Sequence, residues 1–319
     1  MNELLARIGE IGIVPVIKIE SAQAAPALGR ALVAGGIPVA EVTFRTAAAG
    51  EAIRAMSAEV PGLVVGAGTV LSVAQAAAAK EAGARFIVSP AYIPAVVDYC
   101  LGAGLPVLPG VTGPDGIAAG VERGLEVFKF FPAEASGGLP MLDALSAPFG
   151  GIKFVPTGGI DAANVGAYAR KAYILAVGGS WMVKADLIEA GDWAGIERLC
   201  REAVLALHGF SFAHMGVNGA SEAEARERAR LFAELFGIPA KEGASSIFAG
   251  ESVELTKSPF PGERGHIGIR CNDVERAAAR FAALGVKARP ETAKSDKGKL
   301  KAIYLELEIG GFAIHLVKA

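Results

Sequence analysis

The chain repeats eight short apolar runs: IVPVI (13–17), VAEVTF (39–44), LVVGAG (63–68), RFIVS (85–89), PVLPG (106–110), VFKFF (127–131), KFVPTG (153–158) and YILAVGG (173–179). Consecutive runs start about 20 to 26 residues apart, which leaves room for one helix and two short loops between strands. Each run is apolar along its length, as is typical of strands buried on both faces. The pattern predicts a (β/α)₈ TIM barrel. An open doubly wound sheet is the alternative, and it is disfavoured because no GxGxxG motif follows the first run.

Composition excludes several classes of protein. The 319 residues are 52% hydrophobic and carry a formal net charge of −2, so we expect no nucleic-acid partner. No stretch of about 18 apolar residues predicts a membrane span, and the N-terminus does not resemble a signal peptide. The three cysteines are far apart and show no metal-binding spacing. We therefore expect a cytoplasmic protein with reduced thiols.

The pattern changes after His208, where the chain becomes more charged and the regular spacing ends. Two segments of the remainder resemble each other, FSFAHMGVN (210–218) and RGHIGIRCND (264–273), and each precedes a helix-like stretch. This repetition indicates an internal duplication. We predict a barrel domain over residues 1–208 and a smaller α+β domain of paired βαβββ modules over residues 211–319.

Lys129 is the most informative polar residue of the apolar runs. By the two-residue alternation of a strand, it shares one face with Val127 and Phe131. A buried lysine is costly, so its retention indicates a use, and burial favours the uncharged amine that attacks a ketone. The alternative is a structural lysine whose amine reaches the rim of the barrel beside a carboxylate.

Glu41 lies within the second strand and Arg45 comes four residues later, close to the edge where a barrel places its active site. A carboxyl group in an otherwise apolar strand is suited to moving protons during a reaction. The planar guanidinium of Arg45 fits the carboxylate of a 2-oxo acid. The alternative is that Glu41 and Arg45 form only a structural ion pair.

Glycine-rich segments end the seventh and eighth strands, where many barrels bind phosphate through backbone N–H groups. Glycine lets the backbone approach an anion, and a neighbouring hydroxyl can add a hydrogen bond. Barrel turns also use glycine without binding anything. The candidate phosphate ligands are Thr157, Gly158, Gly159, Gly179 and Ser180.

Five motifs together resemble the 2-keto-3-deoxy-6-phosphogluconate (KDPG)/4-hydroxy-2-oxoglutarate (KHG) aldolase family: EVTFRT (41–46), VGAGTV (65–70), FKFFPAEASGG (128–138), PTGGI (156–160) and GGSWMV (178–183). The resemblance covers about residues 5–207. It implies a (β/α)₈ barrel, usually a homotrimer, that needs no metal and reversibly cleaves a sugar acid phosphate to pyruvate and glyceraldehyde 3-phosphate.

The same resemblance implies a role for each matched residue. Lys129 would form the Schiff base, Glu41 would transfer protons and Arg45 would bind the pyruvate carboxylate. Thr69 would contact the pyruvyl group, and the glycine-rich segments would hold the phosphate. The substrate is then a phosphorylated 2-oxo acid.

Four possible metal ligands lie in the second domain: His214, Glu254, His266 and His315. The two halves of the duplication carry them at equivalent places, and imidazole and carboxylate groups suit one divalent ion. This pattern resembles the vicinal-oxygen-chelate (VOC) superfamily, which includes glyoxalase I. Histidine in place of the usual final glutamate favours Zn, Ni, Fe or Mn over Mg or Ca. The alternative is that the histidines pack without metal.

Several functions remain open at this point. The shared pyruvate machinery does not fix the aldehyde half, so 4-hydroxy-2-oxoglutarate or 2-keto-3-deoxy-6-phosphogalactonate is an alternative substrate. A barrel that binds a phosphorylated ligand with an inert lysine is a different class of function. A third hypothesis gives the main activity to the metal domain.

Overall fold

The computed structural model describes residues 2–319, which divide into two compact units. The first unit ends at Leu207, and the second is His208–Ala319. The division lies one residue before the predicted end of the barrel domain, so His208 groups with the second unit.

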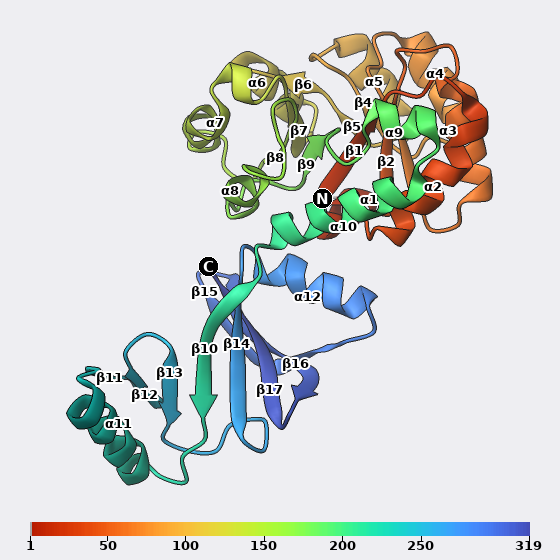
Figure 1. Ribbon diagram of the computed structural model, residues 1–319. Helices are drawn as coiled ribbons and strands as arrows, with labels where there is room; N and C mark the ends of the chain where they lie inside the picture. The colour runs from red at the N-terminus through yellow and green to blue at the C-terminus, as the bar shows by residue number, and fades with distance from the viewer. Residues whose placement is uncertain (1) are drawn as a thin grey trace. The chain divides into compact units, whose positions relative to one another are not determined.

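The first unit alternates strands and helices (Figure 1). Its strands are β1 (Ile13–Ile17), β2 (Val39–Thr43), β3 (Val64–Gly68), β4 (Ile87–Val88), β5 (Val107–Leu108), β6 (Gly110–Val111), β7 (Val127–Phe130), β8 (Lys153–Pro156) and β9 (Val177–Gly179). Its helices are α1 (Glu3–Ile11), α2 (Ala25–Ala34), α3 (Ala49–Glu59), α4 (Val73–Glu81), α5 (Pro94–Gly102), α6 (Pro114–Glu122), α7 (Gly138–Ser146), α8 (Val165–Ala169), α9 (Ala185–Ala190) and α10 (Trp193–His208). Two short 3₁₀ helices, Ala22–Ala24 and Glu134–Ser136, follow β1 and β7.

All strand pairs of the first unit are parallel, and they run in sequence order. One sheet has the order β5-β4-β3-β2-β1-β9, and a second has the order β6-β7-β8. Bridges Phe154↔Ile174 and Thr157↔Gly178 connect the β8 end to the segment that contains β9. The expected fifth strand is divided at Pro109 into β5 and β6, because proline has no N–H group to continue the ladder. The parallel sheet therefore curls, and helices lie on its outer side (Figure 1).

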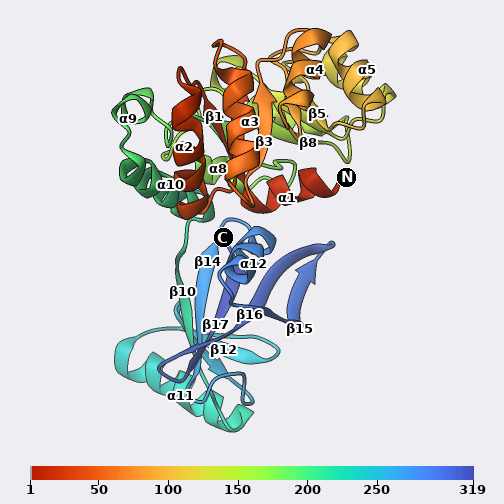
Figure 2. The same ribbon diagram turned by 90° about the vertical axis from the view of Figure 1, so that its right-hand side faces the viewer.

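The second unit consists of two similar halves (Figure 2). The first half contains β10 (Ser211–Val217), α11 (Glu222–Phe236), β11 (Ala240–Glu242), β12 (Ser246–Ala249) and β13 (Val253–Thr256). The second half contains β14 (Gly265–Cys271), α12 (Val274–Ala283), β15 (Ala288–Asp296), β16 (Lys299–Ile309) and β17 (Phe312–Lys318). Both halves thus follow the order β-α-β-β-β.

One eight-stranded sheet joins the two halves, in the order β11-β12-β13-β10-β14-β17-β16-β15. The antiparallel pair β10–β14 lies at its centre, and each of these strands pairs in parallel with the last strand of its own half. Apolar residues of β12 and β13 pack with α11, and those of β16 and β17 pack with α12. Since successive side chains of a strand point to opposite faces, the residues between these apolar ones lie on the face away from the helices.

Two further features concern the helices. Among the described residues, no helix combines the length and apolar character that a membrane crossing requires. Gly191 has a left-handed conformation (φ 66°) and separates α9 from α10.

Candidate functional site

The lysine strand β7 presents Lys129 to the interior of the curled sheet. Its neighbours Phe128 and Phe130 are fully buried on the other face. Phe130 packs edge-on against Phe154 of β8, with ring centroids 6.5 Å apart. Each buried phenylalanine contributes about 1.5–3 kcal/mol of stability, so the orientation of the strand is strongly determined. Lys129 is consequently only 5% exposed.

Lys129 forms a buried ion pair with Glu41 of β2. The Nζ atom donates a hydrogen bond to Glu41 Oε1 at 3.1 Å, and Glu41 is 2% exposed. Gly68 at the end of β3 makes this possible, because a Cβ at that position would lie 2.2 Å from Glu41 Oε1. An amine and a carboxyl group at this distance can exchange a proton directly.

Arg45 lies on the loop that follows β2 and is exposed. Its Nε donates a hydrogen bond to Thr43 Oγ1 at 3.1 Å, and the same hydroxyl donates to the carbonyl oxygen of Ile17 at 2.8 Å. Thr43 thus anchors the guanidinium to the end of β1. Among residues 2–319, Arg45 makes no ion pair, so its other N–H groups are available to an anion.

Thr69 follows Gly68 in a left-handed backbone conformation, with φ 56°. This conformation is unfavourable for a β-branched residue and costs about 1–3 kcal/mol. Such strain is common where a side chain must be aimed at a ligand.

Phe131 lies on another side of the lysine, with its ring centroid 5.2 Å from Lys129 Nζ. Phe131 also lines a cavity of about 300 Å³ with the loops that follow β4 and β6. The lysine is therefore flanked by an aromatic ring as well as by its carboxylate partner.

The glycine-rich ends of β8 and β9 lie side by side. Gly158 and Gly159 have φ angles of 97° and 80°, which other residues adopt only with strain. Thr157 is buried and forms a bridge with Gly178, where a Cβ would lie 2.2 Å from Thr157 Oγ1. Ser180, just after β9, is exposed.

The lysine loop is hydrogen-bonded to the first of these glycine-rich ends. The backbone N–H of Ala133 donates to Thr157 O at 2.7 Å, and that of Glu134 donates to Gly158 O at 3.1 Å. The side chain of Glu134 also accepts a hydrogen bond from the buried Tyr168. The segment after Lys129 and the Thr157–Gly159 turn therefore form one connected structure.

Sequence reasoning missed Thr43 and Gly68, two residues that position the lysine pair and Arg45. Thr43 had a detectable signal, because it lies two residues after Glu41 and so faces the same side of the strand. Gly68 had none beyond its place in a glycine-rich motif. Its role depends on a side chain that comes from another strand.

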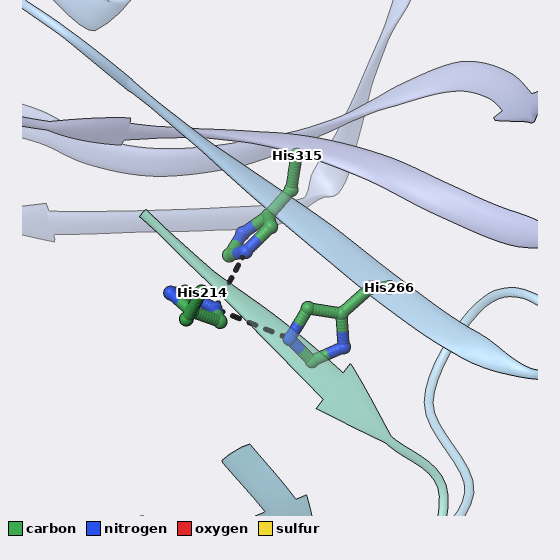
Figure 3. Close-up of side chains that lie close together, drawn as sticks. All are labelled: His214, His266 and His315. Carbon is green, nitrogen blue, oxygen red and sulfur yellow. Dashed lines mark hydrogen bonds between the residues drawn. The ribbon is translucent and has the colours of Figure 1, made fainter. Parts of the chain in front are cut away.

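In the second unit, three histidines meet (Figure 3). They lie on the sheet face opposite the helices, because the apolar residues at alternating positions of these strands pack on the helix side. They come from three different strands, β10, β14 and β17. His214 Nε2 lies 3.3 Å from His266 Nε2 and 3.0 Å from His315 Nε2.

Glu254 of β13 joins the histidine cluster. Its Oε2 lies 3.0 Å from His266 Nε2 and 3.2 Å from His214 Nε2. Burial tends to raise the pKa of Glu254, but hydrogen bonds from His214, His266 and Ser246 outweigh it and hold the pKa far below its usual range. Glu254 is therefore an ionised carboxylate facing imidazole nitrogens.

Two glycines make room for the imidazoles. Gly268 lies opposite His214 on one side and His315 on the other, and Gly216 lies opposite His266. A Cβ on Gly216 would lie 2.0 Å from the His266 ring, and a Cβ on Gly268 would lie 2.6 Å from the His214 ring. The repeated His-x-Gly sequence thus alternates rings and gaps across β10 and β14, an arrangement that the sequence reasoning missed.

The donor atoms of this cluster fit a divalent cation. A neutral imidazole has one N–H group, yet His214 Nε2 faces two nitrogens and a carboxylate oxygen within 3.3 Å. When these nitrogens are deprotonated, their lone pairs and the carboxylate point toward one another, and a cation between them is then stabilised. Metal–ligand bonds of about 2.0–2.2 Å separate neighbouring ligand atoms by about 3.0–3.4 Å. The distances around His214 and Glu254 are 3.0–3.3 Å, and the three histidine ligand atoms all lie within 4.8 Å of one another. Burial lowers the pKa of His315 to about 3, and the two neighbouring histidines add a smaller effect in the same direction. This ring is therefore neutral and can donate a lone pair to a metal.

Comparison with known proteins identifies relatives of the first unit. The family described as KDPG and KHG aldolase matches residues 5–199. The KHG/KDPG aldolase of Escherichia coli K12 is 46% identical over 192 residues, which cover 60% of this chain and 90% of that protein.

Two solved structures are also similar. The KDPG aldolase of Zymomonas mobilis ZM4 with 3-phosphoglycerate is 42% identical, with a TM-score of 0.59 over 63% of this chain and 94% of that one. The Legionella pneumophila KDPG aldolase, with pyruvate captured as a covalent carbinolamine, is 38% identical, with a TM-score of 0.61 over 62% of this chain and 97% of that one. The family match ends at residue 199 and does not extend into the second unit.

Proposed function

Because this chain belongs to the KDPG and KHG aldolase family, we propose that its first unit is a (β/α)₈ barrel in which Lys129 forms a Schiff base with a 2-oxo acid. The chain is an aldolase, a carbon–carbon lyase of class I. The observation that carries the residue assignment is the buried pair of Lys129 and Glu41 at 3.1 Å.

Glu41 first accepts a proton from Lys129, and the free amine attacks the keto carbon of the substrate. Glu41 returns this proton to the hydroxyl of the resulting carbinolamine, which leaves as water and gives a protonated imine. Glu41 then removes the proton of the hydroxyl on the fourth carbon. The bond between the third and fourth carbons breaks, its electrons move into the imine to form an enamine, and the aldehyde leaves. Protonation of the enamine and hydrolysis release pyruvate and restore Lys129.

Arg45 and Thr69 bind the part of the substrate that stays on the lysine. The free N–H groups of Arg45 fit the carboxylate next to the keto carbon, and Thr43 keeps the guanidinium in position. The hydroxyl of Thr69 contacts the pyruvyl group. The strained backbone of Thr69 holds this hydroxyl in place.

The distal phosphate of the substrate binds at the ends of β8 and β9. Gly158 and Gly159 expose backbone N–H groups, Gly179 allows close approach, and Thr157 and Ser180 contribute hydroxyls. This site favours 2-keto-3-deoxy-6-phosphogluconate, which yields glyceraldehyde 3-phosphate, over 4-hydroxy-2-oxoglutarate. The galactonate epimer presents the same phosphate, so the site does not separate these two substrates.

Reductive trapping tests the role of Lys129. The protein is incubated with pyruvate and borohydride, digested, and analysed by mass spectrometry for a modified peptide. Wild type should carry the adduct on Lys129, and Lys129→Ala should carry none. Lys18→Ala is the matched control, because Lys18 directly follows β1 and is exposed, so this variant should label like wild type. An adduct at another lysine, or none in wild type, contradicts the assignment.

Comparing kcat/KM for the three candidate substrates tests the phosphate assignment. Ser180→Ala should raise KM for the two phosphorylated substrates and leave cleavage of 4-hydroxy-2-oxoglutarate unchanged. Equal losses on all three substrates would show that Ser180 does not bind the phosphate.

The converging donors of the second unit support an additional function. We propose that this unit is a VOC-like domain of paired βαβββ modules and binds one divalent ion of Zn, Ni, Fe or Mn. The residues that would hold the ion are His214, Glu254, His266 and His315. A bound ion of this kind polarises an oxygen atom of a small ligand.

Metal analysis after exhaustive dialysis tests this proposal. Wild type should retain about one ion per chain, and His266→Ala should lose it. His208→Ala is the matched control, since His208 is also buried in this unit but is not part of the cluster. Equal metal content in wild type and His266→Ala would contradict the site.

We also propose that the chain forms a homotrimer and works in the cytoplasm. The family resemblance supports the trimer, and the three buried free thiols suit a reducing compartment. Sedimentation equilibrium should give three times the chain mass, and a monomer would contradict the assembly.

A further inference from the structure

Tyr304 of β16 has a largely buried ring, and its hydroxyl makes no hydrogen bond to the described residues. The residue is 6% exposed, and its ring stacks on His315 with centroids 4.7 Å apart and planes 20° apart. Its chain neighbours Ile303 and Leu305 pack on the helix side, so Tyr304 faces the histidine cluster. The Tyr304 hydroxyl is not among the enclosed polar atoms, so it is open to an incoming ligand and can donate a hydrogen bond to it.

The two halves of the second unit differ at the position of this hydroxyl. One row across the sheet contains Tyr304, His315, Gly268 and His214. The equivalent row of the other half contains Phe248, Glu254, Gly216 and His266. Tyr304 and Phe248 are therefore equivalent. A phenyl ring suffices to pack against the cluster, and the hydroxyl of Tyr304 is an addition on one side only.

A cation lies on the same side of the cluster. Lys294 of β15 pairs with Ala302, two residues before Tyr304 on the same face of β16. Its Nζ lies 5.9 Å from the ring centroid of Phe260, which in turn lies 6.1 Å from the His266 ring. Lys294 is exposed and has no ion pair among residues 2–319. Its charge is therefore available to an incoming anion.

We propose that this side of the metal centre binds a small carboxylate, with the Tyr304 hydroxyl donating to a carboxylate oxygen and Lys294 balancing its charge. The inference rests on the metal site proposed above. Three neutral imidazoles and one carboxylate leave a divalent ion with one net positive charge, and Lys294 adds another. A neutral ligand would leave both positive charges uncompensated.

Cobalt(II) and oxalate test this proposal without an activity assay. The full chain is loaded with Co²⁺ alone, and its visible absorption is followed while oxalate is added. The spectrum of wild type should change with saturation. Tyr304→Phe should bind cobalt equally and oxalate about ten-fold more weakly, because one hydrogen bond to a charged acceptor is lost.

Two lysine variants complete the test. Lys294→Gln should weaken oxalate binding about three-fold and reduce its dependence on salt. Lys299→Gln, which removes an exposed lysine from the same β15–β16 hairpin, should behave as wild type. If Tyr304→Phe binds no cobalt, the two lysine variants decide the result.

The possible failures are distinguishable. A wild type that takes up no cobalt defeats the metal site itself. Cobalt uptake without a response to oxalate overturns the carboxylate inference and leaves the metal site intact. Unchanged oxalate affinity in both Tyr304→Phe and Lys294→Gln also overturns it.

Discussion

Replacing Lys129 with methionine should destabilise the first unit as well as abolish turnover. The side chains of Lys129 and Glu41 are only 7% and 3% exposed, and their charges are 3.1 Å apart. At an effective dielectric constant of about 20 the attraction is about 5 kcal/mol, which offsets a desolvation penalty of several kcal/mol per ion. Without the amine, the Glu41 carboxylate remains buried and uncompensated. We expect a loss of about 3–5 kcal/mol in the free energy of unfolding.

The double variant Lys129→Met/Glu41→Gln separates loss of pairing from loss of packing. It removes both charges with little change in volume, so its stability should return to within about 1 kcal/mol of wild type. Urea unfolding followed by tryptophan fluorescence measures this directly. Both tryptophans, Trp181 and Trp193, lie in the first unit, so the second unit does not contribute to the signal. A double variant no more stable than Lys129→Met would refute the buried-charge argument.

Four further predictions follow from individual residues. Gly68→Ala should lower kcat strongly, because a Cβ would lie 2.2 Å from Glu41 Oε1; wild-type rates would contradict this close contact. Thr69→Gly should raise the free energy of unfolding by about 1 kcal/mol and lower kcat/KM, and a less stable variant would argue against strain. Burial raises the pKa of Cys100 to about 11. Burial, with a smaller contribution from Glu197, raises the pKa of Cys200 to about 12. Native protein should therefore resist alkylation at pH 8, while unfolded protein reacts. Burial lowers the pKa of His208 to about 3, with smaller contributions from the positive charges of Arg280 and Arg276. Since its unfolded value is about 6.5, the second unit should lose up to about 3 kcal/mol between pH 7 and pH 4 as the unfolded state takes up the proton, and His208→Phe should reduce this slope in calorimetric scans.

The residues of the lysine pair could be recognised from sequence because they break a local rule. Glu41 and Lys129 each interrupt an apolar strand, and the alternation of side chains assigns each to a face. The division of the fifth strand at Pro109 was also predictable in principle, since proline lacks the N–H group that the ladder needs. These signals involve only neighbouring residues.

The support around the pair could not be predicted in the same way. The contact of Gly68 with Glu41 and the bond from Thr43 to Ile17 join residues of different strands. Both contacts depend on the register of parallel strands about 25 residues apart in the sequence. The hydrophobic pattern alone does not fix that register, because these strands are apolar on both faces.

The second unit shows more clearly which features the sequence predicts and which depend on strand pairing. The His-x-Gly repeat at residues 214–216 and 266–268 is visible in the sequence, and so are the apolar positions that pack against the helices. The side-chain period and the duplication therefore suffice to choose the face on which the histidines lie. That they meet is decided by the antiparallel pairing of β10 with β14, which sets each glycine beside a ring. A slip of one residue in that pairing would send one set of rings to the other face, because the side-chain period of a strand is two.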